Sequence, residues 1–190
     1  MYKQTKHYKE EYYKEEKINS KVYLMSPSGH PNHARTIRGL YDLFSEYLRD
    51  KTCEVFTDNI DIYLDEDNYI IPDLSVICDK SKFSSRGYEG APELIVEVIS
   101  VTSVKRDRFE KFELYSAFGV KEYWIVDYMT KVVEQYVLTE GKYKIYDVVR
   151  ILTNDELRRI PEEERISYST LLTCNVFSDL VINIEDVFNF

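Results

Sequence analysis

The chain has 190 residues, a length that suits one domain spanning 1–190 with its own hydrophobic core. Hydrophobic residues make up 44% and charged residues 31%, both ordinary for a globular protein. The net charge of −9 counts against tight nucleic-acid binding, because proteins that grip phosphates usually carry a basic face. It does not exclude a local basic patch.

The cysteines and the N-terminal residues predict where the protein works. Cys53, Cys78 and Cys174 lie far apart with no CxxC pair, so neither a zinc site nor a redox motif is expected. Their odd number and the lack of a disulfide framework predict a reducing compartment, the cytoplasm. Residues 1–17 are polar and charged, so no signal peptide is expected, and no apolar run is long enough to cross a membrane.

The first elements are predicted from composition and periodicity. Residues 1–17, rich in Lys, Glu and Tyr, predict a short helix or a frayed arm, with the arm over 1–14. A short strand is expected over 21–25 and a turn over 26–29. A helix is predicted over 32–48, because its apolar positions recur every three or four residues, at Ile37, Leu40, Phe44 and Leu48.

Apolar runs predict the sheet that follows. Residues 94–99 are almost all apolar, which indicates a strand covered on both faces. A loop is expected over 80–90, and a helix over 103–118 that ends at Gly119. The other strands are predicted at 60–64, 69–71, 74–78, 123–126, 132–138, 143–149 and 180–184, and further helical segments at 154–165 and 185–190.

Glu97 is the most informative residue, because it stands inside the apolar strand 94–99. A carboxylate is costly in apolar surroundings unless it is paired or binds a cation. The simpler interpretation places Glu97 on a solvated face of the strand, but its neighbours Ile95 and Ile99 on that face are apolar too. The pattern slightly favours a functional carboxylate.

Asp73 follows Pro72, just before the apolar residues 74–77. An Asp after a Pro that interrupts a strand is often only a turn former. Taken with Glu97 on a nearby strand, it predicts two carboxylates that converge on one point. Hard divalent cations such as Mg²⁺ bind to oxygen ligands of this kind.

Lys111 lies in the charged segment 105–111, which opens the helix after the Glu97 strand. It stands four residues after Asp107, so one interpretation is a surface ion pair worth a few tenths of a kcal/mol. The other is a lysine near a scissile phosphate, where it orients or activates water and offsets developing charge. The sequence leaves both open.

Other catalytic patterns are missing. His30 and His33 are separated by Pro31, which argues against a zinc pair, and His33 falls on the apolar stripe of its helix, as buried core histidines do. The sequence contains no GxSxG or P-loop motif, and no pattern supports Cys–His nucleophilic chemistry.

Three blocks carry a family resemblance: 92–100 (PELIVEVIS), then Asp107-Arg108 with Lys111 and Tyr115, then Gly119-Val120 with EYWIVD at 122–127. Together they resemble the Uma-type restriction endonucleases of the PD-(D/E)XK nuclease superfamily. The segments Met25-Ser26-Pro27 with His33, Pro72-Asp73-Leu74 and 177–180 stand where the family has corresponding motifs, so the resemblance covers roughly residues 15–188.

The resemblance implies an α/β (α+β) fold with a restriction-endonuclease-like core, a mixed β-sheet flanked by helices. It implies Asp73 and Glu97 as ligands of Mg²⁺ or Mn²⁺, with His33, and more weakly Glu16, beside the site. The superfamily usually places its lysine two residues after the glutamate, where this chain has Ile99. In this family the lysine has moved to the following helix, which points to Lys111.

Two departures from the family pattern remove no proposed catalytic group. The family commonly has Ser-Pro-Ser-Thr after the glutamate strand, where this chain has SVTS at 100–103. A family glycine before the first strand is Ser20 here.

Two functional hypotheses follow. The first is a metal-dependent endonuclease that hydrolyses DNA phosphodiesters with Asp73, Glu97 and Lys111 as catalytic residues. Asp107 would support Lys111, while Arg106 and Arg108 would hold flanking phosphates. The second is a binding or assembly module of the same fold with little hydrolysis, supported by the acidic charge. For double-strand cutting we expect a homodimer, because twofold DNA sites are matched by twofold proteins.

Overall fold

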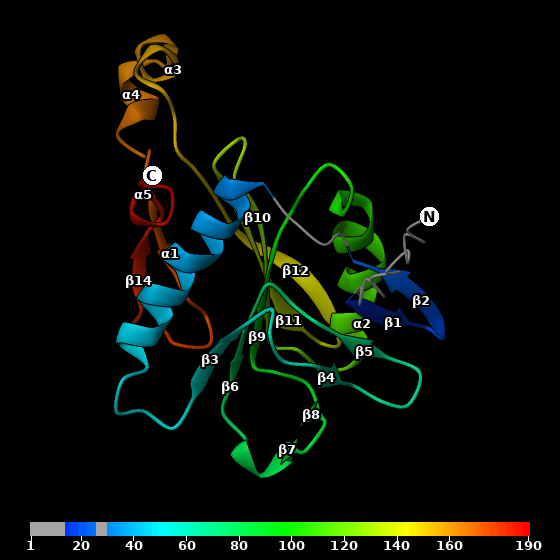
Figure 1. Ribbon diagram of the computed structural model, residues 1–190. Helices are drawn as coiled ribbons and strands as arrows, with labels where there is room; N and C mark the ends of the chain where they lie inside the picture. Colours follow the sequence, from blue (N-terminus) through cyan, green and yellow to red (C-terminus); the bar gives the residue numbers. More distant parts are fainter. Residues whose placement is uncertain (1–13, 26–29) are drawn as a thin grey trace, which may run out of the picture.

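A six-stranded mixed sheet is the centre of the computed structural model, which describes residues 14–25 and 30–190 (Figure 1). β9 and β10 are parallel, and every other neighbouring pair is antiparallel. The strands, in order across the sheet, are β12 (Lys142–Arg150), β11 (Val132–Thr139), β10 (Glu122–Asp127), β9 (Leu94–Val98), β6 (Leu74–Ile77) and β3 (Glu54–Thr57).

A smaller sheet packs beside α2 (Lys111–Ala117). Its strands differ from the sequence-based expectations in two places. Residues 15–18 form a strand and not a helix or an arm, while residues 1–13 and the turn expected at 26–29 lie outside the described residues. The loop expected over 80–90 contains a 3-10 turn, η1 (Lys80–Lys82), and two short strands. In order, this sheet consists of β2 (Lys21–Leu24), β1 (Glu15–Ile18), β5 (Tyr69–Ile70), β4 (Ile62–Tyr63), β8 (Gly87–Glu89) and β7 (Phe83–Ser84).

One face of the central sheet is covered by α1 (Pro31–Tyr47), whose bounds lie close to the predicted helix. Its apolar stripe inserts Phe44 against Trp124 of β10, with ring centroids 5.6 Å apart. The same face also packs against three C-terminal elements: β13 (Leu171–Thr173), β14 (Val181–Asn183) and α5 (Ile184–Val187).

The opposite face is covered by α2 and the smaller sheet. β9 therefore has a core on each side, as its continuous apolar sequence predicts: Val96 and Val98 face α1, and Ile95 and Ile99 face α2. All five residues of β9 are buried. The predicted mixed sheet flanked by helices is confirmed.

The helix predicted over 103–118 contains a local irregularity. Its first part is a π-helical turn, η2 (Arg106–Glu110), which continues into α2. Gly119, at φ +83°, follows the end of this helix, as predicted. Two short helices, α3 (Asn154–Arg159) and α4 (Glu162–Arg165), project away from the sheets (Figure 1). In the described part of the chain, no helix has the length and apolar character needed to cross a membrane.

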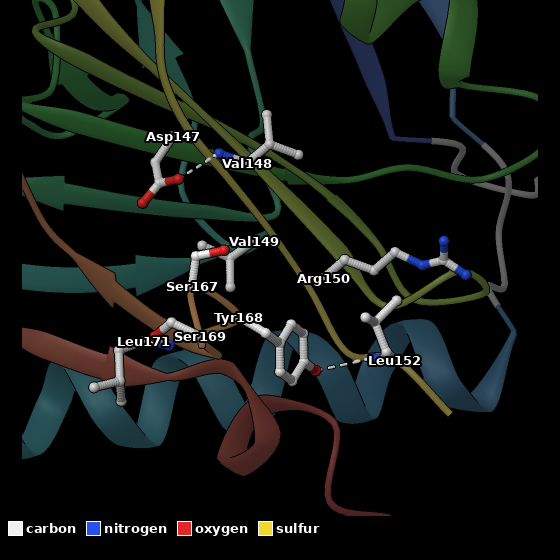
Figure 2. A pocket seen from close by; sticks show the side chains of 9 residues that line it. All are labelled: Asp147, Val148, Val149, Arg150, Leu152, Ser167, Tyr168, Ser169 and Leu171. Atoms are coloured by element: carbon white, nitrogen blue, oxygen red, sulfur yellow. Dashed lines mark hydrogen bonds between the residues drawn. The ribbon is translucent and has the colours of Figure 1, made fainter. Parts of the chain in front are cut away.

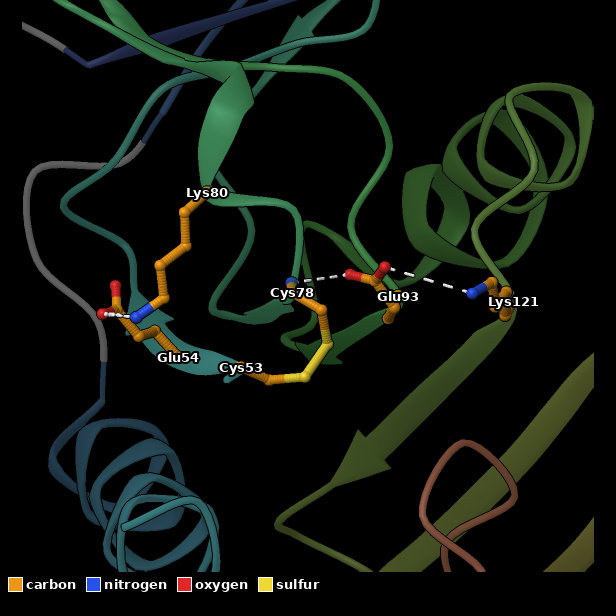
Figure 3. Close-up of a disulfide and its surroundings, with 6 residues drawn as sticks. All are labelled: Cys53, Glu54, Cys78, Lys80, Glu93 and Lys121. Atoms are coloured by element: carbon orange, nitrogen blue, oxygen red, sulfur yellow. Dashed lines mark hydrogen bonds and ion pairs between the residues drawn. A yellow bond between two sulfur atoms is a disulfide. The ribbon is translucent and has the colours of Figure 1, made fainter. Parts of the chain in front are cut away.

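From the sequence, no disulfide framework is expected. This expectation is wrong, because Cys53 and Cys78 form a disulfide (Figure 3). Glu54 of β3 pairs with Ile77 of β6, so the two cysteines are the next opposed residues beyond these strands. The two cysteines are 25 positions apart in the sequence, and no local pattern predicts that they pair. Their pairing depends on how the two strands align. The bond removes one reason for expecting a reducing compartment.

We predict that Cys53→Ser lowers the free energy of unfolding by about 3 kcal/mol under non-reducing conditions, because the disulfide restricts the unfolded chain. Urea unfolding with and without a thiol reductant measures this, and reduced wild-type protein should match the variant. A titration of denatured, unreduced wild type should find one thiol, that of Cys174. Three titratable thiols would contradict the prediction.

Candidate active site

Glu97 is buried on the face of β9 that meets α2, with a relative exposure of 3%. Its neighbours on this face, Ile95 and Ile99, belong to the same buried cluster. The interpretation as a carboxylate on a solvated face is therefore wrong. A carboxylate in such a place needs charged or hydrogen-bonding partners.

Asp73 directly precedes β6, the strand that neighbours β9. Leu74 of β6 pairs with Val96 of β9, so the next residues along the antiparallel register, Asp73 and Glu97, oppose each other. Asp73 Oδ2 accepts a hydrogen bond of 2.8 Å from the Val98 N–H. The predicted convergence of two carboxylates thus follows from the pairing of these two strands.

Lys111 enters the same cluster from the helix. Its Nζ lies 2.8 Å from Glu97 Oε1, 2.8 Å from Glu16 Oε1 and 3.9 Å from Asp107 Oδ1. Lys111 is only 3% exposed and Asp107 only 2%. The interpretation of Asp107 and Lys111 as a surface ion pair is therefore wrong, because both side chains point into the interior.

The π-helical turn η2 positions these two residues. It leads into Lys111, so Asp107 and Lys111 lie on the inward face one turn apart. The Tyr123 hydroxyl of β10 donates a 3.0 Å hydrogen bond to the Asp107 carbonyl and holds the turn against the sheet. π-helical turns often occur at functional sites, where they change the direction in which side chains point.

Two more residues complete the cluster. Glu16 on β1 is fully buried, and its Oε1 also accepts a hydrogen bond of 3.0 Å from the Ile71 N–H. Tyr115 donates a 2.6 Å hydrogen bond to Glu97 Oε1. The four-residue spacing from Lys111 to Tyr115 is a signal that could have placed Tyr115 here. Only the family resemblance pointed to Glu16.

The charges of the cluster are strongly coupled. Burial raises the pKa of Glu97 well above its usual range; Lys111 opposes this shift and Asp107 adds to it. Burial by itself would lower the pKa of Lys111, but Glu16, Glu97 and Asp107 outweigh it, so this pKa is raised. The three carboxylates therefore favour the protonated form of Lys111.

His33 contacts the second carboxylate, with its Nε2 3.4 Å from Asp73 Oδ2. Burial lowers the pKa of His33, yet the hydrogen bond and charge of Asp73 outweigh burial and raise it overall. The N-terminal turn of α1 therefore brings His33 beside Asp73.

The two arginines proposed for phosphate binding are separated. Arg106 stays at the cluster, 3.5 Å from Glu16 Oε2, and its guanidinium lies 4.5 Å from the ring centroid of Tyr23. Arg108 instead pairs with Glu134 on β11, at 2.6 Å. Both cations are thus bound by protein groups in this conformation.

The carboxylates of Asp73 and Glu97 offer oxygen donors of the kind that Mg²⁺ binds. The described residues contain no group of three or more His, Cys, Asp or Glu side chains that could hold a metal. Mg²⁺ is usually held by one or two carboxylates together with water and phosphate oxygens. Within the described part of the chain, hydrogen bonds engage Glu97 Oε1 and Asp73 Oδ2.

A hollow of about 380 Å³ lies elsewhere, between β12 and residues 167–171 (Figure 2). None of the cluster residues lines it. Two of its polar groups are engaged, since Arg150 pairs with Glu156 and the Tyr168 hydroxyl accepts a hydrogen bond from the Leu152 N–H. This hollow therefore does not mark the candidate active site.

Comparison with known proteins identifies the family of this chain. Residues 2–170 match the Uma2 family, described as "Putative restriction endonuclease". The chain belongs to this family. A crystal structure described as "a putative nuclease belonging to DUF820" from Anabaena variabilis aligns with a TM-score of 0.66 and 16% identity, over 92% of this chain and 89% of that one. This likeness confirms the predicted fold.

Curated relatives add little about function. The chain is 34% identical over 104 residues to "Uncharacterized protein slr1290" of Synechocystis, which covers 54% of each protein. It is 29% identical over 109 residues to "Uncharacterized protein sll1609" of the same organism, or 55% of this chain and 62% of that protein. The match spans little more than half the length of these relatives.

We predict that Lys111→Met lowers the free energy of unfolding by about 3–5 kcal/mol, because it leaves buried carboxylates without their cation. Urea unfolding measures the loss. Lys105→Met, an exposed lysine of the same segment, is the matched control and should change stability by less than about 0.5 kcal/mol. A loss for Lys111→Met no larger than that of the control would contradict the buried ion cluster.

Proposed function

We propose that the protein is a metal-dependent endonuclease that hydrolyses phosphodiester bonds of DNA, with Mg²⁺ or Mn²⁺ as its cofactor. One observation carries the proposal: Asp73, just before β6, stands opposite Glu97 of β9 when the register of these strands is extended by one residue, and the buried ammonium of Lys111 is bound to Glu97. The match to a family described as restriction endonucleases supports it. So does the likeness in fold to a protein described as a nuclease.

Asp73 and Glu97 would hold the metal ion through carboxylate oxygens. When bound, the ion polarises the phosphodiester and lowers the pKa of a water molecule. The hydrogen bond from Tyr115 and the ion pair with Lys111 fix Glu97, while His33 and the Val98 N–H fix Asp73. Such prior orientation of ligands reduces the reorganisation needed during reaction.

Lys111 would contribute its fixed charge. Its ammonium is surrounded by three carboxylates and stays protonated, so it stabilises negative charge that develops on a nearby phosphate. Asp107 and Glu16 hold this ammonium in place. In this conformation Arg106 binds Glu16, and Arg108 binds Glu134. Phosphate binding by either arginine would therefore require exchange of these partners.

The direct test is nicking of supercoiled plasmid DNA with Mg²⁺ or Mn²⁺. Wild type should nick the plasmid, and Asp73→Asn should lower the rate roughly 100-fold or more because it removes one metal ligand. Asp42→Asn, an exposed aspartate on α1, is the matched control and should retain the wild-type rate. Equal thermal midpoints of the three proteins in the absence of metal would show that folding does not explain the difference.

One alternative function has specific support. The net charge of −9 and the internal ion pairs of Arg106 and Arg108 fit a module of nuclease fold that binds or assembles with little hydrolysis. Failure of wild type to cut plasmid or single strands with either metal would favour this alternative.

We predict that Mg²⁺ or Mn²⁺ raises the thermal midpoint of wild type, because a ligand that binds only the folded state stabilises it by mass action. The gain is about 2.7 kcal/mol at a concentration 100-fold above the dissociation constant. Differential scanning fluorimetry over a metal series measures it. Asp73→Asn should lose the shift and Asp42→Asn should keep it. Equal shifts in all three proteins would place the metal elsewhere.

Assembly also belongs to this proposal. We propose a homodimer for cutting both strands at one locally unwound site, because twofold DNA sites are matched by twofold proteins. Light scattering over a concentration series tests the dimer, and a mass that stays monomeric would remove it.

A further inference from the structure

An aromatic pair stands at the edge of the sheet where the carboxylates lie. Tyr128 follows β10, which runs parallel to β9, so it emerges at the same strand ends as Glu97 and Val98. The His30 ring stacks on Tyr128, with centroids 5.6 Å apart and planes 16° apart. The His33 ring meets Tyr128 edge-on at 6.1 Å.

His33 connects this pair to the candidate metal ligands, because the same imidazole lies 3.4 Å from Asp73 Oδ2. Tyr128, His33 and Asp73 therefore form a continuous series of contacts. Only the His33 side chain would then separate a group bound on the Tyr128 ring from the carboxylate of Asp73.

The Tyr128 ring is held in place by its surroundings. It is half-buried and packs against the core beneath α1. The turn that carries it is fixed by Asp127, whose side chain accepts hydrogen bonds of 2.9 Å from the Met129 N–H and 2.7 Å from the Thr130 hydroxyl. His30, in contrast, is exposed to solvent. Tyr128 is thus fixed against the core, while the His30 ring is exposed to solvent.

The chemistry of this edge differs from that of a surface that grips duplex DNA. Lys111, Arg106 and Arg108 are bound to carboxylates, and the chain carries a net charge of −9. Affinity for an intact duplex comes largely from cations that neutralise phosphates. Two apolar side chains at this edge are instead widely exposed, Val101 at 82% and Met129 at 68%.

We propose that Tyr128 and His30 bind an unpaired base of a DNA strand by stacking, which presents the neighbouring phosphate to Asp73 and Glu97. Stacking on aromatic rings is how proteins bind single strands with little dependence on sequence. Bases inside an intact duplex have no free face to offer. The substrate class is therefore single-stranded or locally unwound DNA, which includes supercoiled plasmid. This inference rests on the proposed nuclease function.

Binding of a fluorescent oligothymidylate and of a duplex hairpin, measured by anisotropy with Ca²⁺ in place of Mg²⁺, tests the proposal. Wild type should prefer the single strand. Tyr128→Ala should weaken single-strand binding roughly 10- to 100-fold, while Tyr128→Phe, which keeps the ring, should stay close to wild type. Tyr146→Ala removes an exposed tyrosine on β12, outside the site, and should change nothing.

A second readout starts from wild-type protein. A single strand that contains 2-aminopurine should lose fluorescence on binding to wild type, because stacking on an aromatic ring quenches this base. Tyr128→Leu, which keeps apolar volume without the ring, should bind as weakly as Tyr128→Ala and, at saturating protein, quench the base less than wild type.

Three results would overturn the proposal: equal affinity for strand and hairpin, no quenching, or unchanged binding by Tyr128→Ala with an unchanged thermal midpoint. In the last case the stack only fastens the start of α1 to the turn after β10. Metal-dependent nicking that Asp73→Asn abolishes would then still support the nuclease function. Single-strand binding without any cleavage would support the stacking site and count against the nuclease.

Discussion

The buried ammonium of Lys111 joins three parts of the chain that are far apart in sequence. It binds Glu16 on β1, Glu97 on β9 and Asp107 in the π-helical turn. A buried charge left unpaired costs several kcal/mol, so each member is tolerated only because the others are present. The smaller sheet, the central strand and the helix are thus held together by the same contacts that form the candidate site. Stability and chemistry share one set of interactions.

A second buried carboxylate shows why burial by itself does not mark an active site. Glu122 on β10 is fully buried, but neutral donors satisfy it. Trp124 Nε1 and the Val176 N–H each donate at 2.6 Å and Gln135 Nε2 donates at 2.5 Å. This arrangement ties the C-terminal segment to the sheet. Glu97 differs because a cation and a tyrosine share one of its oxygens, and Asp73 stands opposite. Sequence pattern alone does not separate these two glutamates, since both lie in apolar strands.

The acidic composition and the nuclease proposal are compatible once the position of the cations is considered. Lys111 is enclosed by carboxylates, while Arg106 and Arg108 each bind a glutamate. The basic residues nearest the site therefore hold the protein together before any substrate arrives. Net charge describes the long-range field around a protein, whereas the chemistry at a site depends on neighbours within a few ångströms.

Local periodicity was enough to predict α1, β9 and the helix end at Gly119, because apolar spacing and backbone freedom are properties of short segments. The residue pattern singled out Asp73, Glu97 and Lys111, and the family resemblance implied their roles. Only the tertiary structure decided that β1 brings Glu16 to Lys111 and that Cys53 pairs with Cys78. It also decided that the ion pair of Asp107 and Lys111 is buried. Strand partners and register are set by contacts across long stretches of chain, and the burial of a charge depends on which elements cover it.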